Sequence, residues 1–387
     1  MRQFLGLGFA LVLVVGCGAS RFSEDFGRRD GTGRSAAGKG LRVRWSKTLS
    51  QEWGGLYVPL ERAKAALDPS NNRLFIGSSE RILWALEANG RPLYQFRAES
   101  GIEAEPTVDP RTNELYVPTA AGIVHALEAD TGKVRWKAEL SGAISKAAVL
   151  SRDVLYVVTD DDGVFAVARK DGAILWRFKR DPRAGLKIGG HAGLLLADQR
   201  LITGFSDGSV VALSPGDGRA LWVVDTTLDF ADPGQAEQGF VDIDTTPVQI
   251  DDTVYVASFL GGLYGLGASD GVPHVRRSDW TAITSIAAEE HSLIIASADH
   301  GVMCVEAGSL APRWVRKTKP FVASNVEVEH DTVYMTESRG AFLALSLADG
   351  RELGRIQTEH GFLASPSLRD GRGFILGNTG ILYAFDY

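Results

Sequence analysis

Short apolar runs alternate with turns along almost the whole chain. The clearest unit reads Leu115-Tyr116-Val117, then Gly122-Ile123-Val124-His125-Ala126-Leu127, then Thr131-Gly132-Lys133 and finally Trp136. Apolar and polar residues alternate within each run, and turn signals such as Asp162-Gly163 separate the runs, which is typical of short antiparallel strands. The pattern therefore predicts strands joined by tight turns.

The apolar position held by Leu127 marks a repeat. It recurs eight times, at Leu86, Leu127, Val167, Leu213, Leu266, Val305, Leu345 and Phe385, with spacings of 41, 40, 46, 53, 39, 40 and 40 residues. A repeat of about forty residues containing four strands is typical of one blade of a β-propeller. The sequence predicts an all-β protein, an eight-bladed β-propeller of four-stranded antiparallel blades.

The two ends of the repeat array complement each other. The eighth copy stops at Phe385-Asp386-Tyr387, before its closing strand, whereas Leu41-Arg42-Val43-Arg44-Trp45 matches Lys133-Val134-Arg135-Trp136. We therefore expect the N-terminal strand to complete the last blade and to remove the two sheet edges that an open array would expose.

A tryptophan stands on the closing strand of five units. These residues are Trp45, Trp136, Trp176, Trp222 and Trp314. An indole buries a large apolar area, and its N–H can donate to a backbone carbonyl of a neighbouring blade. We interpret the five tryptophans as structural docking residues between blades; stacking on a sugar or a cofactor is the alternative interpretation.

The first forty residues differ in character from the repeat. Arg2 precedes an apolar run from Phe4 to Val15, which is too short for a mature membrane-spanning helix and is typical of a signal peptide. The run ends in Val14-Val15-Gly16-Cys17, the pattern at which bacterial signal peptidases cleave lipoproteins and leave a lipidated cysteine. The sequence predicts a lipoprotein signal peptide over 1–16, a lipidated Cys17 heading a flexible tether over 17–40, and the propeller over 41–387.

Composition and residue spacing argue against nucleic-acid binding, metal binding and serine hydrolase activity. The 387 residues carry a net charge of −7, which disfavours non-specific binding to nucleic acid. If Cys17 is lipidated, Cys304 remains without a partner for a disulfide. The seven histidines show no metal-ligand spacing, and Gly204-Phe205-Ser206-Asp207-Gly208, which fits a hydrolase pattern, falls at a repeat turn. We expect neither a metal nor a catalytic serine.

Two long segments interrupt the repeat on either side of the fourth unit. The segment between Trp176 and Leu201 is basic, and the segment between Trp222 and Pro247 is acidic and ends in Asp242-Ile243-Asp244-Thr245-Thr246-Pro247. Propellers carry function on loops held by a rigid scaffold, so these segments are candidate recognition elements. The alternative is that Asp242 and Asp244 only cap a turn before a strand.

The repeat, with its Ala-Leu, Thr-Gly-Lys and Trp positions, resembles the repeat named after pyrroloquinoline quinone (PQQ) dehydrogenases, which propellers without that cofactor share. Together with the cysteine motif at 14–17 and the Asp-x-Asp-Thr-Thr-Pro segment, it makes the chain similar to the BamB family of lipoproteins of the outer-membrane β-barrel assembly (BAM) machinery. The resemblance implies a non-enzymatic, cofactor-free scaffold, lipid-anchored at the periplasmic face of the outer membrane. Its implied partners are the periplasmic domains of BamA, other BAM subunits and nascent outer-membrane proteins.

The resemblance also implies which residues bind the partner: Leu186, Lys187, Asp242, Asp244 and Thr245. The family carries a Leu-Arg pair where this chain has Leu186-Lys187, so the cation is kept without the planar guanidinium. Because equivalent loops of neighbouring blades lie side by side, we expect Leu186, Lys187, Asp242 and Asp244 to form one patch. Pairing of Lys187 with either aspartate inside the chain is the alternative to direct contact with a partner.

Two other functions remain open from the sequence. A PQQ-dependent quinoprotein dehydrogenase would need a polar central funnel with a calcium site, and the chain has no adjacent cysteines and no large insertions over such a funnel. A propeller lipoprotein with a different partner would show the same repeat.

Overall fold

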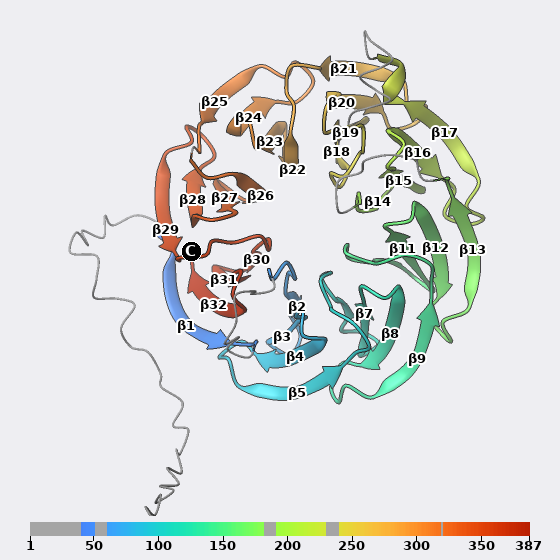
Figure 1. Ribbon diagram of the computed structural model, residues 1–387, viewed down its shortest axis with the longest axis vertical. Coiled ribbons are helices and arrows are strands. Elements are labelled where there is room, and N and C mark those ends of the chain that lie inside the picture. The colour runs from blue at the N-terminus through green and yellow to red at the C-terminus, as the bar shows by residue number, and fades with distance from the viewer. Residues whose placement is uncertain (1–39, 51–59, 182–190, 230–239, 319) are drawn as a thin grey trace, which may run out of the picture. The chain divides into compact units, whose positions relative to one another are not determined.

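The computed structural model describes residues 40–50, 60–181, 191–229, 240–318 and 320–387. In these residues the strands form eight separate four-stranded sheets, and the sheets stand around a common centre like the blades of a fan (Figure 1). All strand pairs within the sheets are antiparallel, for example β11 with β12 and β12 with β13. The predicted eight-bladed, all-β propeller is confirmed.

The first four blades comprise β2–β5 (Ala66–Asp68, Arg73–Ile76, Ile82–Glu87, Pro92–Arg97), β6–β9 (Thr107–Asp109, Glu114–Pro118, Ile123–Glu128, Val134–Glu139), β10–β13 (Val149–Ser151, Val154–Thr159, Gly163–Ala168, Ile174–Lys179) and β14–β17 (Leu195–Ala197, Arg200–Gly204, Ser209–Leu213, Ala220–Asp225). A 3-10 turn, η2 (Thr226–Asp229), follows β17. The next three comprise β18–β21 (Val248–Ile250, Thr253–Ser258, Gly262–Gly267, Pro273–Arg277), β22–β25 (Ile283–Glu289, Ser292–Ser297, Gly301–Glu306, Pro312–Arg316) and β26–β29 (Ala323–Glu329, Thr332–Glu337, Ala341–Ser346, Glu352–Gln357). Blade 8 contains β30 (Ser367–Arg369), β31 (Arg372–Leu376) and β32 (Ile381–Asp386).

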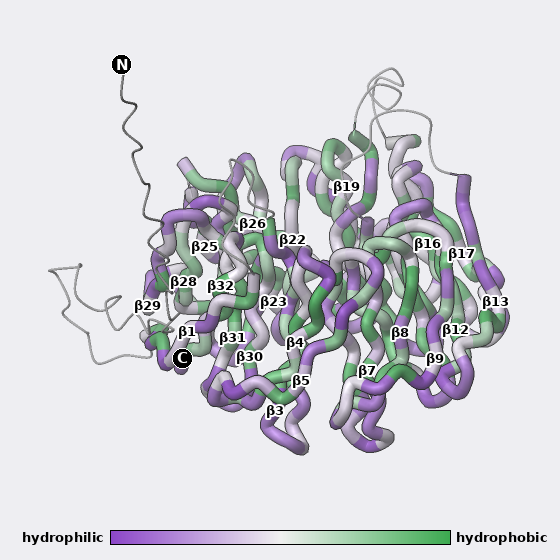
Figure 2. Tube along the Cα trace, turned by 60° about the horizontal axis from the view of Figure 1, so that its bottom comes forward, coloured by the Kyte–Doolittle hydropathy of each residue, from purple (hydrophilic) through white to green (hydrophobic). Residues whose placement is uncertain are grey.

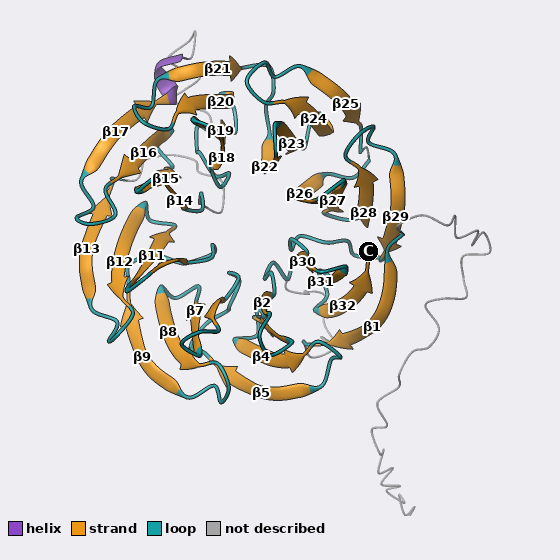
Figure 3. Ribbon diagram, turned by 180° about the vertical axis from the view of Figure 1, so that it is seen from behind, coloured by secondary structure: helices purple, strands orange, loops and turns teal. Residues whose placement is uncertain are grey.

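Blade 8 is completed by the N-terminal strand β1 (Arg42–Thr48). This strand pairs with β32 from Arg42 opposite Asp386 to Thr48 opposite Ile381, and the bond from Leu49 N to Gly380 O (2.8 Å) continues the pairing. Seen from behind, β1 forms the outer strand of the blade that holds the C-terminus (Figure 3). The predicted closure by the two ends of the chain is confirmed, and it joins the last blade to the first.

The core consists of contacts between blades. Middle strands such as β11 and β12 are buried along nearly their whole length because both faces pack against neighbouring blades, whereas the outer strand β13 alternates between exposed and half-buried positions. The buried apolar residues fall into eight clusters, and each cluster joins two consecutive blades. Many of the turns at the lower rim in Figure 2 are hydrophilic, so the apolar side chains concentrate between the blades.

The five tryptophans on the outer strands bond across the blade boundaries. Their indole N–H groups donate to backbone carbonyls of the next blade, in the turn that joins its third and fourth strands. The bonds are Trp45 to Ala88 (3.1 Å), Trp136 to Arg169 (2.7 Å), Trp176 to Pro215 (3.0 Å), Trp222 to Ala268 (3.1 Å) and Trp314 to Leu347 (2.8 Å). In blade 1 the hydroxyl of Tyr94 donates to Ala129 O in the same way (2.9 Å).

A glycine of the receiving turn lies under each ring. At Gly172, φ is +78°, and a Cβ atom would come within 2.6 Å of Cε3 of Trp136, so both the backbone conformation and the close approach require glycine.

The Gly-x-Ser-x-Gly match lies at the turn between β15 and β16, with Gly208 at φ +83°. It therefore stands at a strand-to-strand turn rather than at the strand-to-helix turn of a nucleophile elbow. Within the described residues, no helix is long and apolar enough to cross a membrane.

Candidate functional site

The turn at 205–208, which joins β15 to β16 in blade 4, is contacted by both long segments of the candidate site. The guanidinium of Arg180, just before one long segment, lies 2.6 Å from the carboxylate of Asp207. Thr226 N, where the other long segment begins, bonds to Gly208 O (3.1 Å). Both interruptions of the repeat therefore start at the same turn.

Part of the expected patch lies outside the described residues. Leu186 and Lys187 belong to 182–190, and Cys17 belongs to 1–39, none of which the structure describes. The nearness of Leu186 and Lys187 to the two aspartates therefore stays a prediction.

The segment 240–247 returns to the same turn and then follows β19. Ile243 N bonds to Phe205 O (3.2 Å), and Ile243 forms an isolated antiparallel bridge with Ser258. Phe259 N donates to Asp242 O (3.2 Å). Thr245 is 2 % exposed, and its hydroxyl accepts a bond from Ala257 N (2.9 Å). The backbone at the two aspartates is thus held rigidly, and the Thr245 side chain is used in holding it.

Asp244 carries a carboxylate that the fold only partly satisfies. Its side chain is half-buried, and its Oδ1 atom is buried without a hydrogen-bond partner among the described residues. Burial raises its pKa to about 6, and nearby Asp242 adds to the rise, while the ammonium of Lys146 opposes it. Burial in turn lowers the pKa of Lys146, against the attraction of Asp244. The carboxylate therefore changes its charge close to neutral pH.

Lys146 and Asp244 stand at the inner ends of blades 3 and 5, with His191 of blade 4 between them in the ring. His191 Nε2 accepts a bond from Ser145 N (3.2 Å), and Nδ1 lies 2.9 Å from Ala192 O, so the ring links blades 3 and 4. Neither Lys146 nor His191 was predicted from the sequence as a site residue. The sequence feature that could have indicated them is their position shortly before the first strand of a blade, which is the strand nearest the centre of the ring.

A second charged group lies further round the inner surface. Lys64 Nζ lies 2.8 Å from Glu327 Oε1 and 3.7 Å from Glu105 Oε2, so one ammonium joins the inner ends of blades 1, 7 and 2. Burial raises the pKa of Glu105, against the pull of Lys64. The ammonium thus already pairs with the two carboxylates that a divalent cation there would need as ligands.

Phe240 begins this segment, and Phe259 is joined to it by the bond from its N–H to Asp242 O. The rings of Phe240 and Phe259 meet edge to face with centroids 5.9 Å apart. Leu260, next to Phe259 at the turn between β19 and β20, is 36 % exposed, and Leu228 on η2 is 81 % exposed. Asp242 is only 5% exposed, so the half-buried Asp244 is the carboxylate that this edge presents. A carboxylate beside apolar side chains suits a protein surface that presents cationic and apolar groups.

Comparison with known proteins gives consistent matches. A protein-family model described as "Outer membrane protein assembly factor BamB" matches residues 42–316. The BamB of Yersinia pestis is 26% identical over 263 residues, which are 66% of this chain and 64% of that protein, so the match spans slightly less than two thirds of the relative.

Solved structures agree on the fold. The crystal structure of BamB from Moraxella catarrhalis superposes with a TM-score of 0.75 at 21% identity, covering 90% of this chain and 100% of that one. A quinohemoprotein alcohol dehydrogenase from Pseudomonas putida gives a TM-score of 0.68 at 12% identity, covering 90% and 76%. At these identities the two structures show that the ring architecture is shared.

Proposed function

The chain belongs to the family of the outer membrane protein assembly factor BamB, and from this premise we propose that it is a lipid-anchored, non-catalytic scaffold of the BAM complex. In this proposal residues 1–16 are the signal peptide, Cys17 carries the lipid, and 17–40 tether the propeller to the periplasmic face of the outer membrane. The propeller binds the periplasmic domains of BamA, works with the other subunits, and assists folding and insertion of outer-membrane proteins.

The state of Asp244 is the observation that carries the binding role. A half-buried carboxylate with an unbonded oxygen and a pKa raised to about 6 is unfavourable for the isolated domain at neutral pH. A cationic group of a partner would supply the missing bond and restore the ionised form. The rigid backbone around Ile243 presents this carboxylate in one fixed position.

The scaffold role is favoured over the dehydrogenase by the charges at the inner surface of the ring. Lys64 occupies the space between Glu105 and Glu327 and pairs with both. A calcium ion at that place would have to displace an ammonium that already pairs with both carboxylates. The same side chains therefore support a closed, structural inner surface.

The affinity of the full chain for BamA of the same organism tests the proposal. Asp244→Asn should weaken association about tenfold or more, because the variant keeps the shape and removes the charge. In the parent chain, association should strengthen as the pH rises through about 6, where Asp244 ionises, and the variant should lack this dependence. Asp331→Asn, an exposed charge change at the turn between β26 and β27, is the matched control.

The stability of the propeller should increase in Asp244→Asn, whereas its affinity for BamA should decrease. A carboxyl group whose pKa is raised by folding stabilises the fold below its unfolded pKa, and that contribution is lost as the pH rises through the folded pKa. Asp244→Asn removes this loss, so its unfolding midpoint at pH 7.5 should exceed that of the parent chain. Unchanged affinity for BamA together with a lower midpoint would refute the binding role of Asp244.

The segment that carries Leu186 and Lys187 needs a separate test. Lys187→Glu should also weaken association with BamA, and the double variant with Asp242→Arg distinguishes the two ways in which the residues can act. Partial rescue by the charge swap indicates pairing of Lys187 with Asp242 inside the chain. Because Asp242 is 5% exposed, a further loss indicates contact of each residue with the partner only where the variants keep the unfolding midpoint of the parent chain. Unchanged affinity in both single variants would remove this surface from the proposal.

A further inference from the structure

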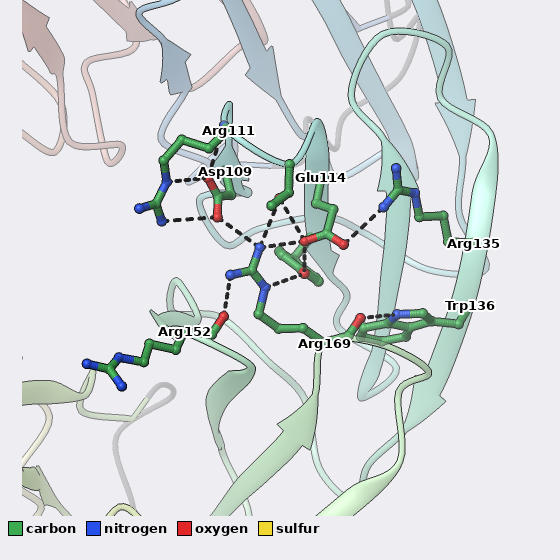
Figure 4. A network of polar contacts seen from close by, with 9 residues as sticks. Asp109, Arg111, Glu114, Arg135, Trp136, Arg152 and Arg169 are labelled. Carbon is green, nitrogen blue, oxygen red and sulfur yellow. Dashed lines mark hydrogen bonds and ion pairs between the residues drawn. The ribbon is translucent and has the colours of Figure 1, made fainter.

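Blades 2 and 3 are joined by charged side chains near the turn between β12 and β13. Arg169, in the turn between β12 and β13, donates to Asp109 Oδ2 (2.8 Å) and to the hydroxyl of Tyr116 (2.9 Å), and it also pairs with Glu114 (Figure 4). Asp109 and Glu114 stand directly opposite each other on β6 and β7. One guanidinium thus pairs with two facing carboxylates across this boundary, and Arg111 and Arg135 each pair with one of them.

The boundary between blades 8 and 1 has the same backbone and different side chains. Ala88 stands where blade 3 has Arg169: its N–H bonds to Asn72 O as Arg169 N bonds to Asp153 O, and its carbonyl accepts from Trp45 as that of Arg169 accepts from Trp136. The methyl group of Ala88 leaves the space of a guanidinium side chain unfilled.

The facing positions on blade 8 carry two like charges. Arg369 and Arg372 stand directly opposite each other on β30 and β31, at the places of Asp109 and Glu114, and Phe374 takes the place of Tyr116 without its hydroxyl. Like charges directly opposite on neighbouring strands are destabilising. Both arginines are exposed, and they stand where the other boundary has two carboxylates that pair with Arg169.

The result is a cavity of about 270 Å³ between blades 8 and 1. Its polar wall includes Arg369 and Arg372, and Leu67, Ala88 and Phe374 supply apolar surface. The volume is just below the ~300 Å³ at which small-molecule sites begin, which is enough for an oxyanion with a short group attached.

Two carboxylates, those of Asp68 and Asp370, line the cavity together with the three arginines Arg73, Arg369 and Arg372, and each already has an arginine beside it. Asp68 pairs with Arg73 at 2.7 Å, and Asp386, opposite Arg372 on β32, pairs with Arg44. Asp370 lies 3.3 Å from Arg369 but is 88 % exposed, and such surface pairs contribute little. No carboxylate of the described residues pairs with Arg372. Three arginines against two aspartates leave the lining of the cavity with an excess of one positive charge.

We propose that this cavity is a binding site for a phosphate group. Two guanidinium groups match the double charge of a phosphate, and each can donate two parallel hydrogen bonds to its oxygens. The bound anion would lie between the two arginines and would supply negative charge to this boundary, as the carboxylates of Asp109 and Glu114 supply it to Arg169.

The position of the cavity favours a phospholipid headgroup over free phosphate. Arg42, at the start of β1, stands opposite Asp386 in the strand pairing, and Tyr387 N bonds to Gly371 O in the turn between β30 and β31. The chain therefore enters the propeller at the rim where the cavity lies. The apolar wall suits the glycerol and first methylenes of a lipid. The lipid source rests on the proposed anchor at Cys17, whereas the phosphate site itself does not.

Calorimetric titration of the full chain in non-ionic detergent tests the proposal. The probes are inorganic phosphate and dihexanoyl phosphatidylglycerol, with acetate at equal ionic strength as the singly charged comparison. Both phosphate compounds should bind saturably and acetate far more weakly. Binding of the lipid that is at least about fivefold tighter assigns the site to a headgroup, and equal affinities assign it to free phosphate.

Substitutions at the cavity connect the binding to its residues. Arg369→Gln and Arg372→Gln should each weaken phosphate binding about tenfold, the loss expected for one charge-assisted contact. Ala88→Glu should abolish binding and raise the unfolding midpoint, because it supplies the missing carboxylate from within the chain. The control is Arg351→Gln, at an exposed arginine in a blade 7 turn without this cavity.

Three results would overturn the site. They are the absence of saturable phosphate binding in the parent chain, full binding by the Arg369→Gln and Arg372→Gln double variant, and an equal loss in Arg351→Gln, which would indicate attraction by surface charge in general. Because none of these measurements involves BamA, failure here leaves the proposed scaffold function untouched.

Discussion

The buried arginine between blades 2 and 3 allows a worked prediction of stability. The side chain of Arg169 is 10% exposed, and the carboxylates of Asp109 and Glu114 are 4% and 14% exposed. Replacing Arg169 by Met keeps much of the packing volume and leaves two carboxylates in the boundary without their shared cation. Removing one partner of a buried ion pair costs about 3–5 kcal/mol, so Arg169→Met should lower the free energy of unfolding by about that amount at pH 7.

The pH dependence of this loss follows from the carboxylates. Burial alone would raise the pKa of Asp109, but hydrogen bonds from Arg111 and Arg169 outweigh burial and lower it. The pKa of Glu114 is lowered by bonds from Tyr116 and Arg169 against the same effect of burial. A carboxyl group with a lowered pKa stabilises the fold above its unfolded pKa, and this stabilisation is lost as the pH falls through the folded pKa. In Arg169→Met both carboxylates can accept protons, so its deficit against the parent chain should shrink toward pH 4.

Urea unfolding followed by tryptophan fluorescence at pH 7 and pH 4 measures both effects. Arg111→Met is the matched control, because Arg111 also bonds to Asp109 but is 84% exposed, and its loss should stay within about 0.5 kcal/mol. Adding Asp109→Asn and Glu114→Gln to Arg169→Met should recover part of the stability at pH 7. A deficit below about 1 kcal/mol, or one that is equal at both pH values, would refute the assignment of this group as a buried electrostatic joint.

Three further perturbations test the closed ring and the proposed lipid anchor. Trp136→Ala should cost about 3–5 kcal/mol, since the indole packs on Gly172 and bonds to Arg169 O; a cost below about 1 kcal/mol in urea unfolding would contradict a structural role. Deleting 41–49 should lower the unfolding midpoint and increase hydrogen exchange in several blades, because β1 closes the ring; exchange confined to blade 8 would count against cooperative closure. Cys17→Ala should release a folded propeller from the membrane fraction, and retention after a high-salt wash would contradict the lipid anchor.

The repeat pattern was sufficient to predict the propeller because the alternation of apolar and polar residues is a local property. Each apolar position at the place of Leu127 faces a neighbouring blade whatever that blade contains, so the number of copies predicts the number of blades. Closure by β1 could also be predicted, since Trp45 and its neighbours match the closing strand that the eighth copy lacks.

The charged groups of the inner surface could not be found in this way. Lys64 and Glu327 are 263 positions apart and meet only because the ring brings blades 1 and 7 around a common centre. Lys146 influences the pKa of Asp244 for the same reason, from a blade two positions away. Such contacts depend on the curvature and closure of the whole ring, and apolar periodicity carries no information about which polar side chains face its centre.

The two lower boundaries compared above differ for a related reason. The backbone bonds at Ala88 and Arg169 correspond one to one, as do the bonds that their carbonyls accept from Trp45 and Trp136, so the ring tolerates either side chain at this place. The two boundaries differ in the charge of the hairpin that faces this place. The hairpin of blade 2 carries two carboxylates, which pair with Arg169, whereas the hairpin of blade 8 carries two guanidinium groups beside the cavity. Because the sheets and the indoles already hold the blades together, a boundary can lose its ionic joint without opening the ring. A repeat fold can therefore place a binding site where a departure from the repeat leaves both a space and an unbalanced charge, and the boundary between blades 8 and 1 meets both conditions.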